Sequence, residues 1–162
     1  MKAFEFNLVF NFNVNKVFEA WSRPDYLKQW WGPPEYSVFI KAFDFQEKGI
    51  FHYSISSMEG FPLWGRFTFG EIIPNQKIEF INSFSDENGN IVRAPFSDTW
   101  PLEIHNQAYF TGNEMFTRFL LKANPLHASP EEIETYMENL ENLKTGFGGT
   151  LNQLNQFLEK SQ

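Results

Sequence analysis

The sequence predicts an α+β fold with an antiparallel β-sheet of six to seven strands, two short helices after the first strand and a long C-terminal α-helix. Three patterns in the 162 residues support this prediction. Apolar residues alternate with polar ones at the N-terminus, and similar segments separated by turn residues follow through the middle of the chain. An apolar stripe with helical spacing then runs to the C-terminus. A period of two is typical of a half-buried strand, and a period of 3.6 is typical of an amphipathic helix.

The first strand is predicted at residues 4–12, where apolar side chains occupy every second position. Such alternation places one face of a strand on a core and the other toward solvent. The predicted core face consists of Phe4, Phe6, Leu8, Phe10 and Phe12.

Two short helices are predicted next, because the apolar spacing changes to that of a helix. Asn13 or Asn15 can cap the first helix. Pro24 suits the first turn of the second helix, where its missing N–H would be unpaired in any case. Gly32 and the prolines after it end that helix. The apolar positions are Val14, Val17, Phe18 and Trp21 in the first helix, and Tyr26, Leu27, Trp30 and Trp31 in the second.

The paired tryptophans Trp30 and Trp31 are predicted to have different surroundings. Adjacent residues of a helix point about 100° apart, so we expect one indole to lie in the core and the other at its rim. Two interpretations remain open at this point. Both indoles serve only packing, or one of them contacts a ligand.

The middle of the chain predicts six further strands, at residues 36–46, 50–57, 63–73, 77–84, 102–110 and 115–122. Glycine, proline, asparagine and aspartate fill the connections between them, as is typical of turns. The connection at residues 86–101 is longer than the others. We expect it to be a mobile surface loop near the mouth of any cavity.

The C-terminal helix is predicted from Ser129 onward. Ser129, Pro130 and Glu132 match a capping box with proline in the first turn. The acidic residues of the helix are interpreted as a solvated face, favoured near the N-terminus by the helix dipole, rather than as a metal or partner site. The apolar stripe consists of Ile133, Tyr136, Met137, Leu140, Leu143, Phe147, Leu151, Leu154 and Leu158.

Three glycines interrupt this helix at Gly146, Gly148 and Gly149. Each costs roughly 1 kcal/mol relative to alanine in a helix interior. One interpretation is a kink or a break into two helices. The other is a close approach to the sheet, or room left for a ligand.

Composition excludes several classes of partner. The net charge is −7 and the basic residues are scattered, so nucleic acid and anionic membrane surfaces are unexpected partners. There is no cysteine, no apolar run long enough to span a bilayer and no signal-peptide core. We therefore expect one cytoplasmic domain over residues 1–162, as a monomer or homodimer. We predict neither a metal site nor a cofactor, because the three histidines have no ligand spacing.

Three motifs carry a resemblance to a known family. The stretch VFEAWSRPDYLKQWWGP, residues 17–33, resembles the opening signature of proteins homologous to the C-terminal domain of the activator of the ninety-kilodalton heat-shock chaperone's ATPase. Residues 71–78, EIIPNQKI, are similar to that family's strand-turn-strand motif. Gly146-Phe147 with Leu151 and Leu154 matches its late-helix pattern. Two loops depart from the family: Lys48 stands before Gly49 where a Gly-Gly pair is usual, and the connection at residues 86–101 is longer.

This family belongs to the START-like, or SRPBCC, superfamily. The resemblance implies the helix-grip fold of the birch pollen allergen, in which a curved sheet wraps around the C-terminal helix and an apolar cavity lies between them. Members bind lipids, hormones or polyketides, and some catalyse cyclisation or dehydration. The residues predicted to line such a cavity are Trp30, Trp31, Phe39, Phe51, Tyr53, Phe67, Phe69, Phe80, Tyr109, Phe119, Phe147 and Leu151.

Several polar side chains are candidates for chemistry in that cavity: His52, Tyr53, Arg66, Glu103, His105, Tyr109 and Arg118. Glu103 and His105 share one face of a strand and can act together as acid and base. The apolar residues Leu102 and Ile104 occupy the opposite face of this strand. This favours an exposed position for Glu103 and His105. His52 alternates against Phe51 in the same way, and we expect it to be exposed too.

Three functions follow from these observations. The leading hypothesis is a protein that encloses a hydrophobic or aromatic small molecule between sheet and C-terminal helix, because 20 phenylalanines need a core or an apolar cavity. The alternative is a cyclase or dehydratase using the same cavity. The third is a co-factor of a chaperone ATPase that acts through protein contacts.

Overall fold

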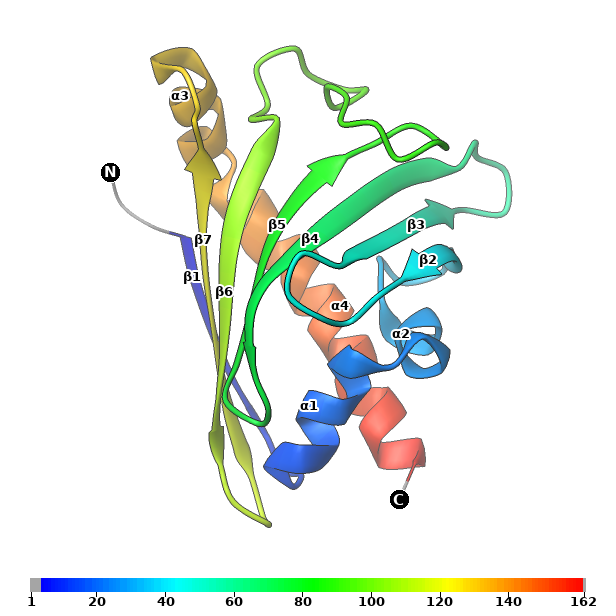
Figure 1. The fold of residues 1–162 in the computed structure, drawn as a ribbon, viewed down its shortest axis with the longest axis vertical. Coiled ribbons are helices and arrows are strands. Elements are labelled where there is room, and N and C mark those ends of the chain that lie inside the picture. Colours follow the sequence, from blue (N-terminus) through cyan, green and yellow to red (C-terminus); the bar gives the residue numbers. More distant parts are fainter. Residues whose placement is uncertain (1–3, 162) are drawn as a thin grey trace.

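The computed structural model describes residues 4–161 and confirms the predicted fold class. Within these residues, seven strands form one curved antiparallel sheet, and four helices accompany it, with the long C-terminal helix on its concave side (Figure 1). The strands are β1 (Phe4–Phe10), β2 (Ser37–Phe43), β3 (Ile50–Ser56), β4 (Leu63–Ile73), β5 (Lys77–Phe84), β6 (Glu103–Gly112) and β7 (Thr117–Leu126). The helices are α1 (Val14–Ser22), α2 (Pro24–Trp30), α3 (Pro130–Glu138) and α4 (Leu140–Lys160).

The strands lie in the order β1-β7-β6-β5-β4-β3-β2. The first strand pairs with the last, from Phe4 opposite Ala123 to Phe10 opposite Thr117. Because β1 and β2 therefore form opposite edges of the sheet, α1 and α2 connect the two edges (Figure 1). Register shifts interrupt the β2–β3 and β4–β5 pairings. Such irregularities increase the local twist and help a sheet to curve around a helix.

Several predicted boundaries differ from the structure by a few residues. The strand predicted at residues 36–46 is shorter, and the one predicted at residues 115–122 extends to Leu126. The extension includes Pro125, which lies opposite Ile104. Asn13, rather than Asn15, caps α1, because its side-chain oxygen accepts from the Asn15 N–H at 2.8 Å.

The C-terminal segment contains two helices, and the break does not lie at the glycines. The predicted capping box at Ser129 begins α3. The helix ends at Glu138 and is capped by Asn139, whose side chain donates to the Thr135 carbonyl at 2.8 Å. α4 then passes through all three glycines without interruption. The interpretation of these glycines as a break is therefore wrong.

The core fills the end of the molecule at which α1 lies between sheet and α4. Trp21 stacks on Phe119 with ring centres 5.5 Å apart and meets Trp30 edge-on at 5.0 Å. Three leucines of α4, Leu151, Leu154 and Leu158, are completely buried there. Among residues 4–161, no helix is long and apolar enough to cross a membrane.

Candidate functional site

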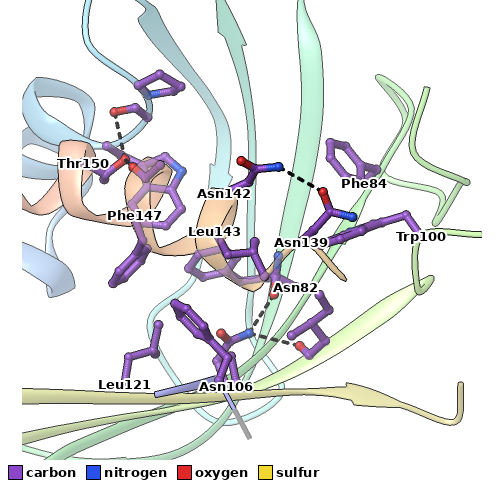
Figure 2. Close-up of a pocket in the computed structure, with 18 of the residues that line it drawn as sticks. Asn82, Phe84, Trp100, Asn106, Leu121, Asn139, Asn142, Leu143, Phe147 and Thr150 are labelled. Carbon is purple, nitrogen blue, oxygen red and sulfur yellow. Dashed lines mark hydrogen bonds between the residues drawn. The ribbon is translucent and has the colours of Figure 1, made fainter. Parts of the chain in front are cut away.

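A cavity of about 560 Å³ lies between the concave face of the sheet and the helices α3 and α4. Strands β3 to β7 form one wall, and α3 with the first half of α4 forms the other. The turn after α2 and the loop between β5 and β6 complete the rim. Figure 2 shows side chains of the sheet and of α4 projecting toward one another across this space.

Aromatic rings make up much of the cavity wall. Phe67 and Phe80 lie on neighbouring strands and stack at 4.1 Å, with their planes 12° apart. Trp31 meets Phe67 edge-on at 5.3 Å, and Phe147 contributes a ring from α4. Rings in these arrangements form a rigid apolar surface against which a flat aromatic molecule can pack.

The two tryptophans divide as expected between core and rim. Trp30 is 1% exposed, and its indole N–H donates to the Ala20 carbonyl at 3.0 Å. Trp31 is only partly buried and lines the cavity. The α2 C-terminus at Trp31 explains the difference, because the chain leaves the helix there and turns the second indole toward the sheet.

Five of the twelve residues predicted to line the cavity do so: Trp31, Tyr53, Phe67, Phe80 and Phe147. Five others are buried outside it: Trp30, Phe51, Phe69, Phe119 and Leu151. The reason is their position along the strands and helix, since α1 inserts Phe18 and Trp21 between sheet and α4 and closes that end. For these five buried residues the inward direction was predicted correctly, but their position along the elements relative to the open space was not.

Two of the twelve lie on the outside of the sheet. Phe39 is 58% exposed on edge strand β2, where it packs edge-on against Trp64. Tyr109 lies below the Lys77 ammonium group, 5.8 Å from its ring centre, away from the cavity. The prediction that Phe39 and Tyr109 line the cavity is therefore wrong.

The charged candidates also point away from the cavity. His105 pairs with Glu79 at 2.7 Å on the convex face, while its neighbours Ile104 and Asn106 line the cavity. The backbone N–H of Glu71 and the His105 ring both bond the Glu79 carboxylate and lower its pKa. Neither Glu103 nor Arg118 lines the cavity. An acid–base pair of Glu103 and His105 inside the cavity is excluded.

The alternation suggested that His52 is exposed, but only 5% of its surface is accessible to solvent. The loop after β5 covers it on the convex side. Its ring packs on Trp64 at 5.0 Å, and its Nε2 lies 3.1 Å from the Asp86 carbonyl oxygen. The Arg66 guanidinium donates to the Gly89 carbonyl of the same loop at 2.7 Å. These side chains hold the loop, and the prediction that His52 is exposed is wrong.

None of the cavity-lining side chains among residues 4–161 carries a formal charge. The two tyrosines in its wall stay protonated near neutral pH. Burial raises the pKa of Tyr53 to about 12, and burial also raises the pKa of Tyr136, whose hydroxyl donates to the Ala123 carbonyl at 2.9 Å. Gly65 leaves room for the Tyr53 hydroxyl, which would lie 2.7 Å from any Cβ there. The described residues also contain no cluster of three acidic or histidine side chains that could hold a metal ion.

Four asparagines supply the amide groups of the cavity, and none of them was predicted from the sequence. Asn82 and Asn106 project from β5 and β6, and Asn139 and Asn142 lie at the α3–α4 junction (Figure 2). A signal for the first two was present in the sequence. Both occupy inward-facing positions of strands whose other inward-facing residues are apolar. A buried polar side chain there is unfavourable unless it forms hydrogen bonds.

The loop at residues 86–101 forms part of the cavity rim and is attached to α3. Trp100 packs against Tyr136 with ring centres 5.5 Å apart. The hydroxyl groups of Thr99 and Thr135 lie 2.8 Å apart. Arg93 bonds Glu132, which also accepts from the Ser129 N–H at 2.8 Å. The predicted place of this loop near the mouth agrees with the structure.

We expect Glu132→Gln to weaken the acid dependence of stability. The Ser129 N–H and then Arg93 lower the pKa of Glu132 below its ordinary value of 4.5. Its stabilising contribution is therefore present above pH 4.5 and lost as the pH falls through the lowered pKa. The substitution should cost up to about 1 kcal/mol at pH 7 and less at pH 3. Urea unfolding at both pH values measures this, and a constant difference would contradict it.

Comparisons with known proteins agree with this architecture. A structure from Arthrobacter aurescens matches with a TM-score of 0.78 and 25% identity, covering 98% of this chain and 87% of that one. The AHSA1 protein of Silicibacter pomeroyi matches with a TM-score of 0.71 and 18% identity, covering 98% and 99%. DynU16, from the dynemicin biosynthetic locus, matches with a TM-score of 0.66 and 17% identity, covering 100% of this chain and 49% of its own.

No curated protein matches the sequence. The family described as "Activator of Hsp90 ATPase homolog 1-like protein" matches residues 11–159, nearly the whole chain. This match confirms the resemblance drawn from the three sequence motifs, and the fold of the structural neighbours agrees with it. The chain therefore belongs to the family of activator of Hsp90 ATPase homolog 1-like proteins.

Proposed function

We propose that this protein binds an uncharged, largely apolar small molecule in the cavity between the sheet and α4. The observation that carries the proposal is a space of about 560 Å³ walled by stacked and edge-on aromatic rings, in which no lining side chain of residues 4–161 is charged. Ligand pockets of proteins commonly have volumes of 300–1,000 Å³ and mostly apolar walls with a few polar groups. Desolvating a charged ligand here would cost far more than desolvating a neutral one, because no lining side chain in the described part of the chain can form an ion pair with it.

The family and its neighbours are compatible with this role. The family to which the chain belongs supports ligand binding or cyclase-type chemistry in general terms. DynU16 comes from a biosynthetic locus, which relates one neighbour of this fold to small-molecule metabolism. We favour binding over catalysis, because the acid and base candidates Glu103 and His105 lie on the convex side of the sheet.

The neutral fluorescent probe N-phenyl-1-naphthylamine tests this proposal. We expect a saturable rise in its fluorescence with one binding site per chain, together with quenching of tryptophan emission, because Trp31 lines the cavity. Native mass spectrometry of the purified protein is expected to reveal a retained small molecule or displacement of it by the probe.

The experiment also separates this function from a chaperone co-factor. Absence of any probe binding to the folded protein would overturn the proposal. If such a protein stimulated the ATPase activity of the heat-shock chaperone, the third hypothesis would replace it. A chain that binds the probe without stimulating the ATPase supports the binding function.

A further inference from the structure

A polar spot interrupts the apolar wall of the cavity on the sheet side. Asn82 and Asn106 lie on the neighbouring strands β5 and β6 and face α4 (Figure 2). Asn106 is 5% exposed. The inward positions next to them along the strands are apolar, including Phe80 and Ile104. A buried amide in such surroundings is unfavourable unless its donors and acceptor find partners.

The contacts of Asn106 determine which way both amides point. Its Nδ2 lies 3.0 Å from the Ile104 carbonyl oxygen and 2.6 Å from the Asn82 Oδ1. A backbone carbonyl only accepts hydrogen bonds, so the atom of Asn106 that faces it must be the NH2 group. Since that NH2 group also meets Asn82, Asn82 must present its oxygen in return.

This orientation leaves one acceptor and one donor group without a partner among residues 4–161. They are the Oδ1 of Asn106 and the Nδ2 of Asn82. Both belong to side chains that line the cavity. The sheet therefore presents a hydrogen-bond acceptor beside a hydrogen-bond donor, surrounded by the rings of the cavity wall.

We propose that the cavity selects neutral aromatic molecules that carry a carboxamide or lactam group, whose adjacent C=O and N–H complement the Asn82 donor and the Asn106 acceptor. This inference rests on the proposed function. The aromatic body of the ligand packs against the wall formed by Phe67, Phe80 and Phe147. A carboxylate is discriminated against, because it has no proton for the Asn106 oxygen and the wall formed by the described residues offers it no cation.

Three naphthalene derivatives of similar shape test this inference on the unmodified protein. 2-Naphthamide offers a donor and an acceptor, 2-acetonaphthone only an acceptor, and 2-naphthoate a negative charge. Affinities are measured at neutral pH by displacement of N-phenyl-1-naphthylamine. We expect the amide to bind about tenfold more tightly than the ketone, since it makes one more hydrogen bond in a buried site. The carboxylate should bind most weakly.

Two variants locate the source of the preference. Asn82→Leu removes the donor and leaves the Asn106 bond to Ile104 in place. It should lower the affinity for 2-naphthamide about tenfold relative to the affinity for N-phenyl-1-naphthylamine. Asn7→Leu is the matched control, because Asn7 is an exposed asparagine on strand β1 that does not line the cavity. It should leave the preference for the amide unchanged.

The outcomes separate this inference from the proposed function. Binding of N-phenyl-1-naphthylamine with equal affinities for amide and carboxylate would overturn the amide selectivity and leave the binding function intact. A preference that survives in Asn82→Leu, or that disappears equally in Asn7→Leu, would overturn the assigned site. Failure of all four compounds to bind would overturn both proposals. The three ligands are compared on the unmodified protein, so the amide selectivity is tested even if a variant fails to fold.

Discussion

Gly146→Leu is expected to abolish the binding of N-phenyl-1-naphthylamine while the protein remains folded. Gly146 lines the cavity, and a Cβ placed there would meet no atom within 4 Å. Because Gly146 is exposed and also lines the cavity, a leucine side chain there should occupy space at the edge of the cavity and hinder the ligand. Replacing glycine by leucine within a helix should also stabilise α4 by up to about 0.8 kcal/mol. We expect the affinity to fall at least 30-fold, with no loss of the urea unfolding midpoint.

The matched control for this prediction is Gly149→Ala on the same helix. A Cβ at Gly149 would contact a Pro34 side-chain atom at 3.6 Å, an ordinary packing distance, and Gly149 does not line the cavity. This substitution should raise the helix propensity in the same way and leave ligand affinity unchanged. Full affinity in Gly146→Leu, or an equal loss in Gly149→Ala, would show that the ligand lies elsewhere.

Trp30→Ala is expected to destabilise the protein by about 3–5 kcal/mol, the range for truncating a large buried aromatic side chain. Trp30 is buried, meets Trp21 edge-on and donates to the Ala20 carbonyl. Trp31→Ala should cost less than half as much, because Trp31 already borders an open cavity. It should instead weaken probe binding, since it removes part of the aromatic wall.

Urea unfolding and probe titration of both variants measure this contrast. If Trp30→Ala does not fold, Trp30→Phe serves in its place, because it keeps a ring and loses the bond to Ala20. That variant should cost about 1–3 kcal/mol with unchanged probe affinity. Equal destabilisation by the two alanine variants, or equal loss of probe binding, would contradict the division of the tryptophans between core and cavity.

Much of the cavity wall was predictable from strand parity, because adjacent residues of a strand point to opposite faces. Phe67 and Phe80 are examples, and their inward direction follows from alternation alone. Parity does not report depth along a strand. Phe119 has the correct direction but lies beneath Trp21 of α1, so packing between distant segments removed it from the cavity.

The burial of His52 shows a second limit of strand patterns. Its parity places it correctly on the convex side, but the loop near Asp86 folds back over that side. The sequence separation between the two residues hides this contact from any local pattern. Asn82 and Asn106 were missed for a different reason. A single polar residue in a strand is easily taken for a surface position, even where its neighbours on the same face are apolar.

The amino-acid sequence alone was sufficient for the α+β class, the capping box at Ser129, the contrast between Trp30 and Trp31, and the family, because each depends on local spacing. The extent of the cavity, the opening beside Gly146 and the pairing of Asn82 with Asn106 depend on how α1 and α4 pack against the sheet. Spacing along the chain determines which face a side chain occupies. Only contacts between distant segments determine whether that face meets a neighbour or an empty space.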